Sequence, residues 1–115
     1  MFKVTRDLAA TAQGYRFSIT ETHHAAKKDA PSGTALTLKK IVEAARPGTT
    51  VEIASKREGD VPGIHEVEAR SDNDAIVLRH EAFSRRGFAE GAVKAAEWIA
   101  GKTGCWAFEE VLAEL

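Results

Sequence analysis

Residues 64–82, IHEVEARSDNDAIVLRHEA, decide the fold class. Two runs that can form strands, 64–70 and 75–82, flank the segment 71–74, whose Ser, Asp and Asn residues favour a turn. A further short strand is predicted at residues 51–53, so strands follow one another along this part of the chain. Consecutive strands are typical of an α+β fold, whereas strict alternation with helices would indicate a parallel α/β sheet.

The residues before this region predict a helix followed by a strand. Apolar residues at helical spacing predict a helix over residues 2–13 that ends near Gly14. Apolar and polar residues alternate over 15–20, which predicts a half-buried strand. If the strand runs on, Glu21 and His23 continue its apolar phase.

Three more helical segments and one exposed connection complete the pattern. A helix is predicted over 34–46, where the Pro-Gly pair at 47–48 stops it. Residues 55–63 are polar and rich in glycine and are expected to be an exposed connection. A long amphipathic helix is predicted over 86–100, and a final turn or helix over 108–115.

Together these elements predict an α+β fold, with a small mixed β-sheet of about four strands and helices packed on one face. The helices at 34–46 and 86–100 are expected to cover that face. The last strand carries Ile76 and Leu78 on one side and Val77 on the other, a pattern typical of a strand buried on both faces. The other face of the sheet is therefore expected to be used for oligomerisation.

Composition indicates a single domain over residues 1–115 and narrows the class of partner. The chain is 43% apolar and 29% charged, near the averages for globular proteins. A net charge of −1 favours neither nucleic acid nor an anionic membrane as a partner. No apolar run is long enough to span a membrane, and the first residues do not resemble a signal peptide.

The numbers and spacing of cysteines and histidines indicate the redox environment of the protein and whether it has a metal site. Cys105 is alone, which excludes an intrachain disulfide and fits a reducing, cytoplasmic location. The four histidines, His23, His24, His65 and His80, show no helical i,i+4 spacing, so no metal site is expected.

One loop concentrates groups that can bind anions and transfer protons: residues 21–34, ETHHAAKKDAPSGT. Two imidazoles leave the predicted strand, a lysine follows, and Ser-Gly-Thr opens the next helix, whose free amides suit a carboxylate or a phosphate. Each part also has an ordinary interpretation, because Ser-Gly-Thr can be a simple N-cap and adjacent histidines are often surface residues. The candidate residues are His23, His24, Lys27, Ser32, Gly33 and Thr34.

This loop resembles a family signature. Residues 21–35 match the run Glu-x-His-His-x-x-Lys-x-Asp-Ala-Pro-Ser-Gly-Thr-Ala of dihydrodipicolinate reductases at every fixed position. Residues 63–65 resemble the family's Gly-Glu-His segment, with Ile64 in place of Glu, and residues 80–92 resemble its His-x-Ala-x-x-Arg-x-x-Phe-Ala-x-Gly-Ala segment. The chain is thus similar to the C-terminal substrate-binding and oligomerisation domain of that family.

The resemblance implies an activity and residue roles. These enzymes reduce a cyclic dicarboxylate, 4-hydroxy-tetrahydrodipicolinate, with hydride from NADH or NADPH in lysine and diaminopimelate biosynthesis. By position, His23 would be the catalytic histidine and Lys27 the proton donor. Arg85 would lie near the cofactor. The positions that match the substrate-carboxylate contacts are His24, Ser32, Gly33 and Thr34. The family's C-terminal domains associate through their sheets, which implies a homotetramer or a dimer.

The chain lacks one part of the family pattern. No strand is followed by the Gly-x-Gly-x-x-Gly turn of a dinucleotide-binding domain. The N-terminal nucleotide-binding domain is therefore expected to be absent, so that this chain alone is inactive and binds no NADH or NADPH. The alternative is a stand-alone dicarboxylate-binding or oligomerisation module without catalysis.

Overall fold

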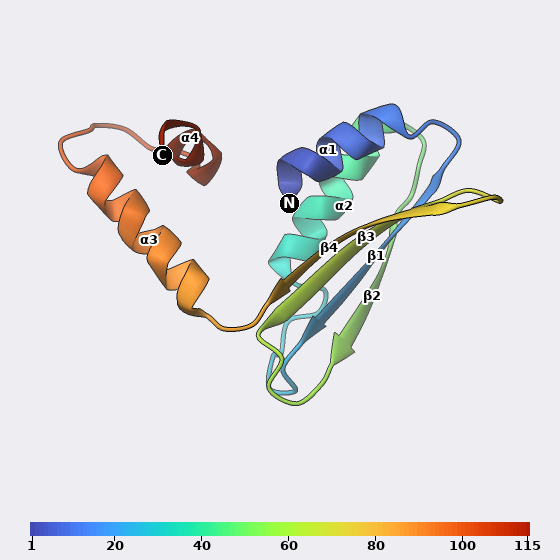
Figure 1. The fold of residues 1–115 in the computed structure, drawn as a ribbon, viewed down its shortest axis with the longest axis horizontal. Coiled ribbons are helices and arrows are strands. Elements are labelled where there is room, and N and C mark those ends of the chain that lie inside the picture. Colours follow the sequence, from blue (N-terminus) through green and yellow to red (C-terminus); the bar gives the residue numbers. More distant parts are fainter. The chain divides into compact units, whose positions relative to one another are not determined.

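The computed structural model describes all residues from 1 to 115 and contains four helices and one four-stranded sheet (Figure 1). This confirms the predicted α+β class. The chain divides into two compact units, residues 1–83 and 84–115, and each is described by itself. None of the helices is long and apolar enough to cross a lipid bilayer.

The first unit contains the sheet and two helices. Its elements are α1 (Phe2–Thr11), β1 (Arg16–His23), α2 (Gly33–Ala45), β2 (Glu52–Arg57), β3 (Gly63–Arg70) and β4 (Ala75–Ala82). Each was predicted, but the prediction ended the second strand too early. Residues 55–57 are part of β2, because its parallel pairing with β1 continues as far as His23 and Arg57.

The sheet is mixed, as predicted, with the strand order β2-β1-β3-β4. β1 pairs in parallel with β2 and antiparallel with β3, and β3 pairs antiparallel with β4. A parallel pair needs a crossover connection, and α2 provides it between β1 and β2. The antiparallel β3–β4 pair is the hairpin expected from the Ser-Asp-Asn-Asp turn at 71–74.

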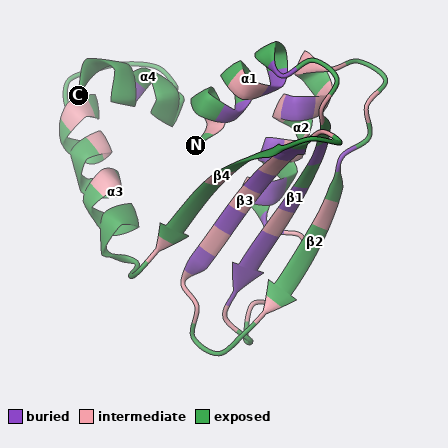
Figure 2. Cartoon of the chain, turned by 45° about the vertical axis from the view of Figure 1, so that its right-hand side comes forward, coloured by how far each residue is buried: buried purple, intermediate pink, exposed green.

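Helices α1 and α2 form the layer on one face of the sheet (Figure 1). The sequence did not assign α1 to this layer, where it packs against α2. The helix at 86–100, which was expected to cover this face, belongs to the other unit. Small residues allow α1 to pack closely. Buried residues concentrate on β1, β3 and the inner sides of the helices (Figure 2). The core comprises Ala9, Ala12, Phe17, Ile19, Ala35, Leu38, Val42, Val51, Val67 and Ala69.

Strand β4 lies at the edge of the sheet, and its apolar residues are not buried on both faces within this chain. Ile76 is 39% exposed and Val77 is 51% exposed. Ile76 and Leu78 point to the helical face, opposite core residues of β3, so Val77 points to the outer face. That outer face is mainly polar, and Arg79 forms ion pairs there with Glu66 and Glu81. Within this chain the strand is therefore not buried on both faces, because the pleat turns Ile76 and Leu78 inward and leaves Val77 exposed on a mainly polar outer face.

The second unit contains α3 (Arg86–Ile99) and α4 (Phe108–Glu114), as predicted. Trp98 and Trp106 pack edge to face with ring centroids 5.5 Å apart, and the Trp98 indole donates a hydrogen bond to Glu114. Lys102 lies over the Trp98 ring and pairs with the same carboxylate. Val111 is its only buried residue, so aromatic and charge contacts hold this unit together.

Candidate functional site

The helical face of the sheet changes from apolar to polar toward the end where β1 and β2 finish. Because paired residues share a face, the strand register defines rows across the sheet. An apolar row is followed by two rows that carry titratable groups. The three rows are Ile53-Ile19-Val67-Leu78, then Ser55-Glu21-His65-His80, then Arg57-His23 beside Gly63-Ala82.

The carboxylate of Glu21 is the centre of this polar cluster. Glu21 is fully buried, and its oxygens accept hydrogen bonds from His23 Nδ1 at 2.5 Å and from the Ser32 amide at 3.1 Å. Both terminal nitrogens of Arg57 donate to it at 2.9 Å. Burial alone would raise the pKa of this carboxyl, but hydrogen bonds, led by those from Arg57 and His23, lower its pKa to about 2. The carboxylate is therefore ionised at neutral pH.

Arg57 was not among the site residues predicted from the sequence. Its side chain reaches across from β2 to Glu21, and Nη2 also donates to the Asp29 carbonyl at 2.7 Å. Arg57 thus ties the loop that follows β1 to the sheet. The available signal was alternation, because Arg57 lies an even number of residues after Ile53 and so shares its face. The polar composition of residues 55–57 concealed it.

His65 also belongs to the cluster. Its Nε2 lies 3.0 Å from Ser32 Oγ, and its ring packs edge to face with that of His23, with centroids 5.1 Å apart. Burial, reinforced by charge on His23, lowers the pKa of His65 to about 4. His65 is therefore neutral at physiological pH. A Cβ at Gly63 would lie only 3.2 Å from His23 Nε2, so glycine there gives the His23 ring its space.

The pKa of His65 predicts a pH dependence of stability. In the unfolded chain His65 takes up a proton near pH 6.5, whereas the folded protein resists protonation down to about pH 4. As pH falls, the unfolded state therefore takes up the proton first. The contribution of neutral His65 to the free energy of unfolding is complete above pH 6.5 and is lost toward pH 4. Between these pH values we expect the free energy of unfolding to fall by up to about 1.4 kcal/mol for each pH unit because of His65.

Urea unfolding across this range, for the wild type and His65→Gln, measures the effect. The variant should show the shallower dependence of unfolding free energy on pH. Equal slopes in the two proteins would contradict the assignment.

The loop brings some of the predicted residues together. His23 is buried, His24 is half-buried, and Lys27 pairs with Asp29 at 2.8 Å. Ser32 is the N-cap of α2, where its Oγ accepts from the Ala35 amide at 3.2 Å. The N-cap interpretation therefore holds for the Ser32 side chain.

The amide of Ser32 is not a free donor, contrary to expectation, because it donates to Glu21. Gly33 and Thr34 begin α2 and present the next amides of the helix N-terminus. Arg85, the N-cap of α3, belongs to the second unit. No group of three or more His, Cys, Asp or Glu side chains is arranged to hold a metal ion.

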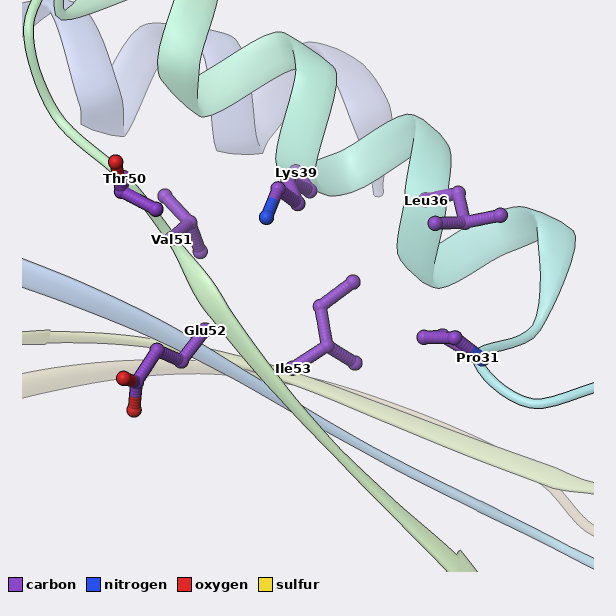
Figure 3. A pocket seen from close by; sticks show the side chains of 7 residues that line it. All are labelled: Pro31, Leu36, Lys39, Thr50, Val51, Glu52 and Ile53. Atoms are coloured by element: carbon purple, nitrogen blue, oxygen red, sulfur yellow. The ribbon is translucent and has the colours of Figure 1, made fainter.

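A pocket of about 450 Å³ lies between α2 and β2 in the first unit, with Pro31 of the loop at its edge (Figure 3). Leu36 and Lys39 of α2 face Val51 and Ile53 across it. The Lys39 ammonium pairs with Glu43 at 3.6 Å, and none of the imidazoles lines the pocket. The polar cluster, which holds the titratable groups, is therefore the candidate functional site.

Fold and site together define an α+β domain in which one end of the sheet carries two imidazoles, a buried ionised carboxylate and the start of a helix. Such a set can orient an anionic ligand and move protons. The family profile "Dihydrodipicolinate reductase, C-terminus" matches residues 1–112. The chain belongs to this family and corresponds to its C-terminal domain, which confirms the resemblance seen in the sequence.

Curated relatives support the assignment. The chain is 41% identical to the 4-hydroxy-tetrahydrodipicolinate reductase of Christiangramia forsetii, over 99% of this chain and 54% of that protein. Identity to the enzyme of the same name from Methanosarcina mazei is 36%, over 96% of this chain and 48% of the relative. The chain thus spans about half the length of the relatives that it matches.

A solved structure shares the fold. It is described as dipicolinate-bound dihydrodipicolinate reductase from Paenisporosarcina sp. TG-14. The match has a TM-score of 0.69 at 22% identity and covers 85% of this chain and 45% of the other.

Proposed function

We propose that this chain is the substrate-binding half of a cytoplasmic reductase that acts on 4-hydroxy-tetrahydrodipicolinate in lysine and diaminopimelate biosynthesis. The family match over residues 1–112 carries the proposal. A bound NADH or NADPH would supply the hydride, and a nucleotide-binding domain outside residues 1–115 would hold it. The chain alone is then inactive, and Arg85 is the residue assigned to the cofactor side.

The polar cluster supports roles for its residues. His23 reaches the helix start through Glu21, which bonds to the Ser32 amide, and Lys27 lies in the same loop, where it pairs with Asp29. Both are acid groups that can give a proton to a substrate ring on which negative charge develops. His24, Gly33 and Thr34 bind the substrate carboxylates through an imidazole and helix N-terminal amides. The Ser32 amide is bonded to Glu21, so Ser32 contributes through its hydroxyl, which can donate its proton to a carboxylate while Oγ accepts from Ala35 and His65.

A second candidate is a stand-alone module that binds a dicarboxylate or forms oligomers without catalysis. The observation in its favour is that Glu21, Arg57 and Ser32 hold the loop in place through contacts within this chain. The reductase half and a dicarboxylate-binding module both predict ligand binding at the loop, whereas a module that only forms oligomers does not. They differ in whether a nucleotide domain joined to this one produces NADH- or NADPH-dependent turnover.

Dipicolinate, the ligand in the Paenisporosarcina structure, is the probe for the loop. We expect weak binding, because water is not excluded when the site is open on one side. Amide shift mapping should place the largest changes at residues 23–34. Lys27→Ala should weaken binding, whereas Lys28→Ala, at an exposed neighbouring lysine, should leave it nearly unchanged.

Changes scattered over the rest of the chain, or none at millimolar dipicolinate, would count against a substrate site in the loop. Calorimetry with NADH and NADPH tests the other half of the proposal. Tight binding of either cofactor to this chain would show that its nucleotide site is not in another domain.

We also propose that the domain forms a homo-oligomer, a tetramer or a dimer, through the outer face of its sheet. The resemblance motivates this, and exposed Val77 offers an apolar contact among the ion pairs of that face. Sedimentation equilibrium at micromolar concentration should show an assembly. Val77→Asp should weaken it, whereas Leu36→Asp, on α2, should not. A wild-type monomer of 12.4 kDa would refute the proposal.

A further inference from the structure

The bond between Glu21 and His23 has a defined direction. An ionised carboxylate can only accept hydrogen bonds, and the pKa of Glu21, lowered to about 2, keeps it ionised. His23 Nδ1, at 2.5 Å from Oε2, must therefore carry the proton of this bond. Neutral imidazole has one N–H, so Nε2 is then the unprotonated nitrogen.

We propose that Glu21, held by Arg57, is a positioning residue that fixes the Nδ1–H tautomer of His23 and reserves Nε2 as the nitrogen that exchanges protons with a ligand. The proposal rests on the proposed function only in giving His23 a proton-transfer role. The tautomer itself follows from the contacts within this chain.

Arg57 and Ser32 restrict how Glu21 can respond. Arg57 Nη2 and the Ser32 amide both donate to Oε1, while Arg57 Nη1 donates to Oε2. These donors hold the carboxylate plane, so Oε2 stays directed at His23. The Ser55 hydroxyl also bonds to Glu21 and can rotate. Of the four donors in the bonds above, only the His23 ring can exchange the donor role for an acceptor role, by moving its proton to Nε2.

The other ring of the cluster is unsuited to this role. Nε2 of His65 is bonded to Ser32 Oγ, and burial keeps the pKa of His65 at about 4. On the His23 side, glycine at position 63 omits the side chain that would crowd Nε2, because a Cβ there would lie 3.2 Å from that nitrogen. The geometry therefore assigns proton exchange to His23 Nε2.

Ring-nitrogen NMR of the histidine-labelled 115-residue protein tests the proposal. Spectra are followed to a pH at which His23 is neutral, and Arg57, Lys27, His65 and His80 are the other ionisable groups around the cluster. The wild type should show a protonated Nδ1 and an unprotonated Nε2 at His23. The opposite pattern would overturn the proposal without any variant.

Glu21→Gln provides the sharper test. If the amide oxygen takes the Oε1 position, it still accepts from the Ser32 amide and Arg57 Nη2. Once His23 Nδ1 has become an acceptor, the only donor that then faces the new NH₂ group is Arg57 Nη1. In the reverse orientation the NH₂ group would face two donors, the Ser32 amide and Arg57 Nη2. The NH₂ group should therefore face Nδ1 and move the His23 proton to Nε2. Arg57→Lys, which keeps the Glu21 carboxylate, is the control and should retain the Nδ1–H form.

An unchanged tautomer in folded Glu21→Gln, or the same reversal in Arg57→Lys, would overturn the proposal, because the tautomer would not then depend on the carboxylate. The outcome is separable from the proposed function. If wild-type protein does not bind dipicolinate while the tautomer follows Glu21, the positioning role stands and the substrate site fails.

Discussion

Replacing Arg57 with methionine should lower the free energy of unfolding by about 3–5 kcal/mol, the cost of leaving one member of a buried ion pair without its partner. Glu21 is fully buried, and its carboxylate accepts two of its hydrogen bonds from Arg57. Methionine occupies similar space but has no donor. The Asp29 carbonyl loses a donor as well, so the loop after β1 is also released. Urea unfolding near neutral pH measures the loss.

The matched control for this prediction is Arg79→Met. Arg79 also pairs with two carboxylates, those of Glu66 and Glu81, but its side chain is 44% exposed, against 19% for Arg57. Ion pairs on the surface contribute at most about 1 kcal/mol, because water screens them. A loss for Arg57→Met no larger than that for Arg79→Met would mean that Glu21 is not a buried charge.

Replacing Leu38 with alanine should cost about 2–5 kcal/mol, because it removes apolar side-chain atoms from the core and leaves a cavity. Leu38 is fully buried at the centre of α2, the helix that covers β1, β2 and β3. The loss should appear as a lower midpoint in urea with a similar slope, as expected when the fold is retained.

Leu36→Ala is the control on the same helix. Leu36 is 43% exposed, so its truncation should cost much less than that of Leu38. Similar losses at the two positions would show that the helix does not present the Leu38 side to the sheet.

Much of the fold could be predicted because its signals are local. Residues 64–82 contain both strands of a hairpin and the turn between them, so composition alone identified β3 and β4. Helical spacing likewise identified α2 and α3. Helical spacing also identified α1, but which helix packs beside α2 was not predictable in this way, because periodicity identifies a helix and not the element that it contacts.

In the candidate site, too, residues close together in the sequence could be predicted and distant ones could not. The loop at 21–34 is contiguous in sequence, so its histidines, lysine and helix start were recognised together. Arg57 lies 36 residues after Glu21 and meets it only through strand pairing. The ends of a polar strand carry little signal, and β2 was predicted too short for that reason. The contact from the Ser32 amide to Glu21 depends on backbone path and had no sequence signal.

The two anchored ends of the loop have a consequence for the speed of recognition. Glu21, where the loop leaves β1, also holds the Ser32 amide where the loop enters α2, and Arg57 fixes the Asp29 carbonyl between them. The chain between these anchors loses its conformational entropy on folding, before any ligand arrives. An anion that binds at the helix start therefore meets a preorganised surface, so its association rate should be limited by diffusion and desolvation, with no slow ordering step.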